Sequence, residues 1–261
     1  MTGNSTKGDK TSGHIHDPWE GLKRFTDARI AIGRSGASLP TEEVLSFALS
    51  HARARDAVHT PFDPEPLEQG LQALGLATIR ATSRVPDRAT YLARPDLGRR
   101  LSESSAEAIA ALGAKPCDIA LVIADGLSTT AVAANALGFV SHLLPMLTRI
   151  KLSVGPVAIV ENGRVAVADE IGEILKARMV IMAIGERPGL SSVDSLGAYL
   201  TFAPKVGRSD AERNCISNIR AGGLKPPLAA EKAFWLTREG LRRGLTGVNL
   251  KEETGTMLPE D

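Results

Sequence analysis

The pattern of apolar and polar positions divides the chain into a helical first part and a second part in which short apolar runs alternate with helical stretches. In the first part, apolar side chains recur at i, i+3, i+4 and i+7 from Leu45 to Ala52, which predicts an amphipathic helix. Ser38 or Thr41 would cap its start. We expect the region 19–113 to be helical.

The second part begins near Ala114, where the composition changes. Residues 117–124 are a mainly apolar run of strand length, and Ser128 opens an Ala-rich helical stretch that we expect to end before Pro145. The pattern then repeats. The further elements that we expect are a strand at 156–160, a tight turn at Asn162 and Gly163 with a hairpin partner at 164–167, a helix at 169–177, strands at 179–184 and 198–202, a polar loop through Arg220, and a helix at 228–243.

Strands that alternate with helices predict an α/β fold whose sheet is parallel or mostly parallel and covered on both faces. We assign this sheet to the domain 114–250. The polar residues 1–18 predict a flexible leader, and residues 251–261 a flexible tail. His14 and His16 in the leader lack the further ligands of a metal site, and their role stays open.

Composition excludes several classes of protein. Lys and Arg total 31 against 30 Asp and Glu, and aromatic residues are 4%, which argues against a general nucleic-acid binder. The apolar runs are short and interrupted, so we expect no membrane span. Two distant cysteines, Cys117 and Cys215, and a polar start without a secretory signal predict a cytoplasmic protein.

Three loops follow predicted strands and are candidates for a binding site, because ligands of open parallel sheets bind outside the carboxyl ends of the strands. The first contains Asp125, Gly126 and Ser128. The second, at 185–190, contains Glu186 and Arg187, and the third, at 213–218, contains Asn214 and Cys215. Each loop offers a small residue for close approach and a polar group to orient a ligand.

The familiar enzymatic motifs are missing from the sequence, which contains no GxGxxG after a strand, no GxxxxGK[ST], no GxSxG, no CxxC and no HExxH. Cys215 follows Arg213 closely, but an ordinary thiol with a pKa of about 8.5 is only slightly ionised at pH 7. Glu186 beside Arg187 is either a loop ion pair or a carboxylate that accepts hydrogen bonds from a large ligand. The residues alone indicate an α/β ligand-binding protein without a self-contained catalytic set.

Five segments in this order and spacing resemble the small subunit of ethanolamine ammonia-lyase. They are RPDLGRRL at 94–101, ADGLS at 124–128, DEIGEIL at 169–175, GERPGL at 185–190 and NCISNI at 214–219. The resemblance runs from Arg24 to Leu241, and the leader looks shorter than in some members of that family.

The resemblance implies a helical amino-terminal part, a Rossmann-like carboxyl-terminal domain and an adenosylcobalamin cofactor held against a large subunit that carries the substrate site. The family's cobalamin contacts match Val165, Glu186 and Cys215 here. Neighbouring residues of the same loops, Asp125, Gly126, Ser128, Arg164, Arg187 and Asn214, are further candidates. The sequence lacks the DxHxxG pattern of cobalamin proteins that replace the lower base, so dimethylbenzimidazole would stay on cobalt.

The implied reaction is the radical deamination of ethanolamine to acetaldehyde and ammonia, in which the cofactor supplies the difficult chemistry. This chain would contribute no catalytic residue and no metal ligand. Its arginine clusters, at 84–88 and 94–100, are then either solvated turns or anchors to the large subunit. The location would be the cytoplasm, with a bacterial microcompartment as the narrower alternative.

Two other functions stay open at this point. One is a self-sufficient α/β enzyme that uses Cys215 and Glu186 on a small substrate. The other is a non-catalytic scaffold subunit whose sheet only packs against a partner. Subunit stoichiometry does not follow from the sequence.

Overall fold

The computed structural model describes residues 14–15, 17–26 and 28–252, which form two compact units, Met1–Ala54 and Arg55–Asp261. Most of the leader and tail predictions, and His16, fall outside the described residues. In the first unit, strand β1 (His14–Ile15) pairs antiparallel with β2 (Arg34–Ser35), and a 3-10 helix covers Glu20–Phe25. Helix α1 (Thr41–His59) confirms the first predicted helix.

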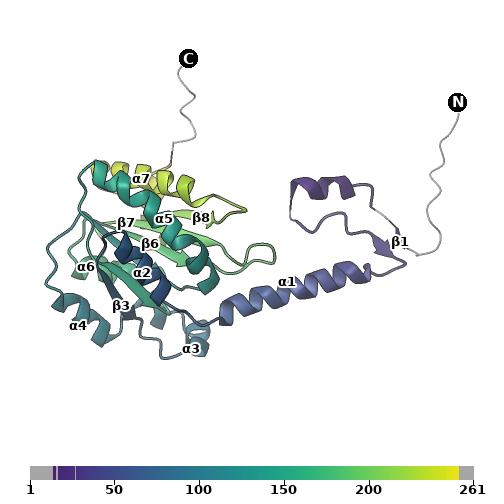
Figure 1. Cartoon of the computed structure of the whole chain (residues 1–261), viewed down its shortest axis with the longest axis horizontal. Helices are drawn as coiled ribbons and strands as arrows, with labels where there is room; N and C mark the ends of the chain where they lie inside the picture. The colour runs from purple at the N-terminus through teal and green to yellow at the C-terminus, as the bar shows by residue number, and fades with distance from the viewer. Residues whose placement is uncertain (1–13, 16, 27, 253–261) are drawn as a thin grey trace, which may run out of the picture. The chain divides into compact units, whose positions relative to one another are not determined.

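The second unit is built on one six-stranded sheet with the order β3-β5-β4-β6-β7-β8. Figure 1 labels β3, β6, β7 and β8 of this sheet. Its strands are β3 (Thr78–Thr82), β4 (Ile119–Ala124), β5 (Val157–Glu161), β6 (Met179–Gly185), β7 (Leu196–Phe202) and β8 (Arg213–Ile219). The first four strands in the sheet are mutually parallel, whereas β7 and β8 are antiparallel to their neighbours. The predicted α/β fold with a mostly parallel sheet is confirmed.

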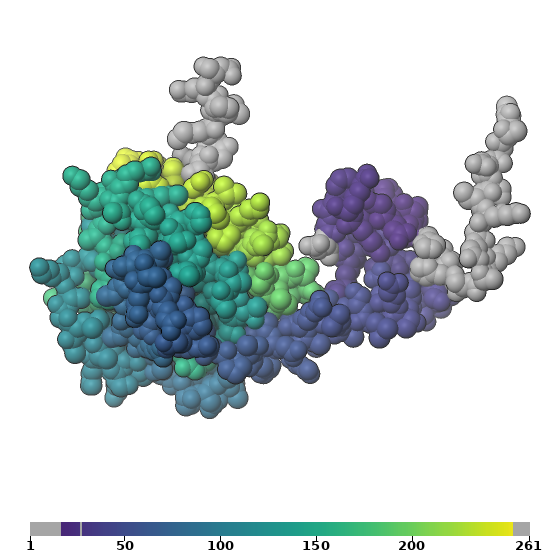
Figure 2. All heavy atoms as spheres, viewed as in Figure 1, coloured from purple at the N-terminus to yellow at the C-terminus, as the bar shows by residue number. Residues whose placement is uncertain are grey.

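Helices cover both faces of the sheet. One face packs against α2 (Glu65–Ala73), α5 (Thr129–Arg149) and α7 (Pro226–Arg243), and the other against α4 (Glu103–Ala111) and α6 (Val167–Ile174). The short helix α3 (Arg88–Ala93) precedes α4. Figure 2 shows the side chains of α2 and α5 closing over the first face.

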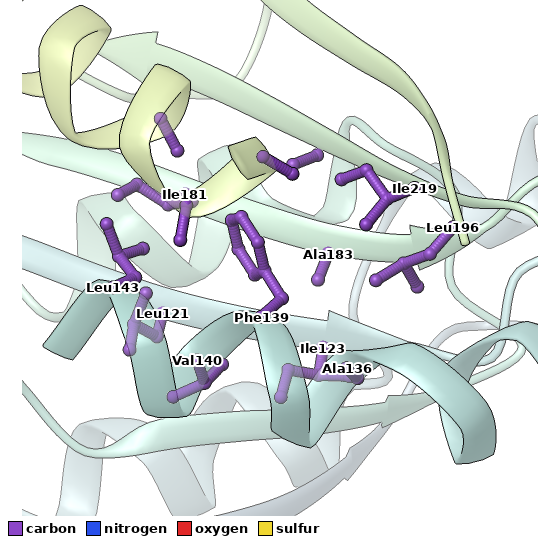
Figure 3. Packing of buried hydrophobic residues seen from close by; sticks show 14 of the residues in the cluster. Leu121, Ile123, Ala136, Phe139, Val140, Leu143, Ile181, Ala183, Leu196 and Ile219 are labelled. Atoms are coloured by element: carbon purple, nitrogen blue, oxygen red, sulfur yellow. The ribbon is translucent and has the colours of Figure 1, made fainter. Parts of the chain in front are cut away.

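The main core lies between the sheet and the α5 and α7 pair. Phe139 of α5 is fully buried and points toward Ile181 and Ala183 of β6 (Figure 3). Every residue of β4 is buried, because helices cover this central strand from both sides. By length and hydropathy alone α5 is long and apolar enough to cross a membrane, which is weak evidence, since its apolar side chains fill this core.

Helix α5 continues past Pro145, where we expected it to end. Leu143 and Leu147 on either side of the proline are fully buried, so their packing in the core stabilises the helix across Pro145. Pro145 itself is exposed, and water can therefore reach the carbonyl group of Ser141 that the proline leaves without an N–H donor.

The predicted hairpin at 164–167 is wrong. β5 already has β3 on one edge and β4 on the other, so no edge is free for a hairpin partner. Asn162 adopts a φ of +54°, as a tight turn requires, but the turn leads directly into α6, which begins at Val167 and ends at Ile174 rather than at residue 177.

Two strands were missed. β3 lies in the region 19–113 that we expected to be helical, and it joins the sheet beside β5, so α2, α3 and α4 belong to the same unit as the sheet. β8 replaces the polar loop expected before Arg220. Both are edge strands with few buried residues, which gives them a weak apolar pattern.

Candidate functional site

The loops after β4 and β6 touch at the carboxyl edge of the sheet. Leu127 donates its N–H to the carbonyl oxygen of Gly185 at 2.9 Å. Gly126 has a φ of +57°, and a Cβ there would lie 2.2 Å from the same oxygen. A Cβ on Gly185 would lie 2.1 Å from the Ser128 carbonyl oxygen. Glycine is therefore required on both sides of this contact.

A hollow of about 410 Å³ opens above this contact. Residues from six separate stretches of the sequence line it. They are Tyr91, Gly126, Leu127, Arg164, Val165, Ile184, Gly185, Glu186, Arg187, Tyr199 and Ser217. The structure thus brings residues of all three predicted loops together at one site with the segment after β5.

Glu186 is fixed in this hollow by hydrogen bonds to its carboxylate. Ser195 donates to Oε2 at 2.5 Å, Ser217 donates to Oε1 at 2.6 Å, and the backbone N–H of Asn218 donates to Oε2 at 3.1 Å. Gly197 leaves the space that the carboxylate needs, since a Cβ there would lie 3.0 Å from Oε1. An ionised carboxylate has about four acceptor positions, so one stays available for a ligand.

Arg187, by contrast, is exposed and forms no ion pair with a described residue, so the loop ion pair with Glu186 is wrong. The serines and the Asn218 amide occupy the carboxylate instead.

Cys215 lies on β8, directly opposite Tyr199 of β7. Burial raises the pKa of the Cys215 thiol; the hydrogen bond with Tyr199 opposes this in part, and the nearby Glu186 carboxylate adds a smaller upward effect. Cys215 is exposed at the surface and lines a second hollow of about 380 Å³, which shares Ser217 with the first. Cys215 is therefore a protonated neighbour of the Glu186 site rather than a thiolate.

Tyr91 is fully buried and contacts two arginines. The guanidinium carbon of Arg164 lies 4.1 Å from the centre of its ring, and that of Arg88 lies 4.7 Å away. The phenol donates to the Gly163 carbonyl at 2.9 Å. Among the described residues, Arg164 Nε and Arg88 Nη2 are the buried side-chain atoms that lack a hydrogen-bond partner.

Asp125 is buried under the loop after β4. Arg88 Nη1 donates to its carboxylate at 3.1 Å and to the Gly126 carbonyl at 2.9 Å, and the Gly163 N–H also donates to the carboxylate, at 3.3 Å. Burial outweighs these contacts and raises the pKa of Asp125 to about 7. Asp125 thus supports the hollow from below and does not line it.

Two other candidates have structural roles. Ser128 caps α5 by accepting from the Ala131 N–H at 3.1 Å, and its hydroxyl donates to the Val193 carbonyl at 2.7 Å. The Asn214 side chain donates to the Leu250 carbonyl at 2.7 Å and accepts from the Gly247 N–H at 2.9 Å. Val165 and Arg164 line the hollow from the turn before α6.

Some arginines of the two clusters form ion pairs with carboxylates of the same chain. Arg100 forms a two-bond pair with Glu170 of α6, at 2.9 and 3.0 Å, and Arg94 forms one with Asp96, at 2.9 and 2.7 Å. A role as anchors to a partner stays a prediction.

Sequence reasoning missed Arg88, Tyr91, Ser195, Tyr199 and Ser217. Ser217 lies in the NCISNI segment and Arg88 in the arginine cluster at 84–88. Their places in these segments were the sequence signal that could have identified them as site residues. Tyr91, Ser195 and Tyr199 reach the site through strand pairing and helix packing, which leave no local sequence signal.

The fold and the site together define an α/β protein with a hollow at the carboxyl edge of a mostly parallel sheet. The family model described as ethanolamine ammonia-lyase light chain matches residues 16–251. The chain belongs to this family, which confirms the resemblance seen in the sequence.

Curated relatives cover nearly the whole chain. The ethanolamine ammonia-lyase small subunit of Bradyrhizobium diazoefficiens is 56% identical over 248 residues, which are 92% of this chain and 95% of that protein. The protein of the same name from Azotobacter vinelandii is 54% identical over 240 residues, 91% of this chain and 89% of its own length.

Proposed function

We propose that the chain is the cofactor-holding small subunit of an adenosylcobalamin-dependent ethanolamine ammonia-lyase. In this proposal its Rossmann-like second unit holds the cofactor, base-on, against a large subunit that deaminates ethanolamine to acetaldehyde and ammonia. The single observation that carries it is the Glu186 carboxylate, which three donors fix in an open hollow beside Val165 while one acceptor position stays free.

The residues present fit a corrinoid with amide side chains. Glu186 accepts from an amide N–H, the unpartnered Nε of Arg164 donates to an acceptor, and Val165 and Leu127 offer apolar contact. A hollow of about 410 Å³ has the size of a small-molecule site and encloses only part of so large a ligand. The rest of the ligand would lie against the partner subunit.

The cofactor, when bound, supplies the radical chemistry. The residues of this chain bind and orient it and exclude water from one side. Cys215 does not act as a nucleophile in this proposal, since burial raises the pKa of its thiol. This argues against the self-sufficient cysteine enzyme.

The test uses this chain alone, the large subunit alone, and the two purified as a complex. We expect ammonia release from ethanolamine only with the complex plus adenosylcobalamin, and a corrinoid absorption spectrum that stays with the complex during gel filtration. Turnover by this chain alone would refute the proposal. A native complex that retains no corrinoid would support the scaffold function in its place.

A further inference from the structure

Arg164 lines the hollow and carries a buried hydrogen-bond donor that no described residue uses. Its Nη2 donates to the Tyr91 carbonyl at 3.1 Å, whereas its Nε is buried without a partner. A buried N–H of a charged group without an acceptor is costly, and such a group in a site is commonly satisfied by a ligand.

The side chain is also held in place before any ligand binds. The guanidinium lies over the Tyr91 ring at 4.1 Å, and the backbone N–H of Arg164 donates to the Gly98 carbonyl at 2.7 Å. Gly98 leaves room for the side chain, since a Cβ there would lie 2.8 Å from Arg164 Cγ. A fixed guanidinium loses little entropy when it binds an anion.

The charges of the hollow favour a single anion. Arg164 and Arg187 carry two positive charges and Glu186 carries one negative charge, so the lining has a net charge of +1. No described carboxylate forms an ion pair with Arg164 or Arg187. The Glu186 carboxylate is already bonded to Ser195, Ser217 and Asn218.

We propose that Arg164 is an anion subsite for the phosphodiester in the nucleotide tail of the corrinoid. The inference rests on the proposed function and adds to it the group that this arginine recognises. The peripheral amides of a cobalamin are neutral, and its phosphodiester is the anion that it carries at neutral pH. Arg is suited to phosphate because its planar fork makes charge-assisted hydrogen bonds.

The experiment compares cyanocobalamin, which has the nucleotide tail, with dicyanocobinamide, which lacks both the nucleotide and the phosphate. Binding of each to the complex of both subunits is measured by spectral titration. For Arg164→Gln we expect cyanocobalamin to bind about tenfold to hundredfold more weakly, while cobinamide affinity changes less than about twofold. Arg149→Gln is the matched control, because Arg149 is exposed at the carboxyl end of α5 and lies outside the hollow.

A second measurement on the unmodified complex decides the matter if Arg164→Gln fails to fold. At equal ionic strength, replacing chloride with inorganic phosphate should weaken cyanocobalamin binding at least about twofold and leave cobinamide binding unchanged. Equal effects on both corrinoids, or no effect on either, would overturn the subsite. An unmodified complex that binds neither corrinoid would instead overturn the proposed function.

Discussion

At the scale of single residues, the site depends on how each polar group is satisfied. Glu186 is fixed by Ser195 and Ser217, and Asp125 is buried beneath the loop that bears Gly126. One carboxylate thus faces the hollow with an acceptor position free, while the other is sealed below it. The two acidic residues should therefore respond differently to substitution and to pH.

Replacing Glu186 should weaken cofactor binding. We expect Glu186→Ala to lose about 1–3 kcal/mol of corrinoid affinity, because the ligand amide loses its acceptor and Ser195 and Ser217 lose theirs. Glu107→Ala, at an exposed position of α4, is the control. Spectral titration of the complex measures both, and an unchanged affinity for Glu186→Ala would contradict the contact.

Asp125 should make the stability of the chain depend on pH near neutrality. Its pKa rises from 3.8 to about 7 on folding, so between these values the folded chain holds a proton that the unfolded chain has released. The free energy of unfolding should therefore fall as pH rises from about 4 to about 7, by at most about 1.4 kcal/mol per unit from this group.

Asp125→Asn removes this contribution, so its stability should fall less steeply over the same range. Urea unfolding of both proteins between about pH 5 and about pH 8 measures the difference. Parallel pH profiles for the two proteins would show that Asp125 titrates normally in the folded chain.

At the scale of elements, the contact between the loops after β4 and β6 sets the shape of the hollow. Leu127 donates across it to Gly185, and neither Gly126 nor Gly185 has space for a Cβ. The loops cannot separate without losing this bond, so the positions of Leu127 and Glu186 around the hollow depend on two glycines.

We expect Gly126→Ala to lower the free energy of unfolding by at least about 3 kcal/mol, because the new Cβ meets the Gly185 carbonyl oxygen. Gly113→Ala is the matched control. Gly113 has a φ of +55° against +57° for Gly126 but nothing within 4 Å, so only the backbone strain of about 1–2 kcal/mol should appear. Equal losses in urea unfolding would show that the loop contact adjusts freely.

The sequence predicts the central elements of the fold well and its edges poorly. The buried strands β4 and β6 are continuous apolar runs, which a local pattern reveals. β8 contains Asn214, Ser217 and Asn218, which favour turns, and it becomes a strand because β7 offers it an edge. The Asn162–Gly163 pair has the composition of a hairpin turn. The strands that pair with β5, however, are β3 and β4, which come from earlier parts of the chain, so no hairpin forms.

The site follows the same division. Its predicted loops were identifiable from their positions after strands, and Val165 and Glu186 do line one hollow. The partners that fix Glu186 come from 9 to 32 residues away along the chain, so no local spacing indicates them.

At the scale of the whole molecule, the two units differ in how they bury apolar side chains. Both apolar cores lie within the second unit. The first unit exposes several large apolar side chains, namely Trp19, Leu22, Phe25, Leu39, Val44, Leu45, Phe47 and Leu49. The stability of the second unit should therefore depend little on the first.

A fragment of residues 55–252 should fold on its own. We expect its free energy of unfolding to lie within about 1 kcal/mol of that of the full chain, because the cores are complete within it. Urea unfolding of the two proteins provides the comparison. A fragment that aggregates or unfolds without a cooperative transition would show that the first unit supports the sheet.

The chain has two tyrosines, and both line the hollow. Burial raises the pKa of each phenol, Tyr91 beside two arginines and Tyr199 opposite Cys215. Both phenols should therefore stay protonated in the folded chain at a pH where an exposed tyrosine ionises, and the phenolate absorbance that appears on alkaline unfolding marks the opening of this hollow without a label.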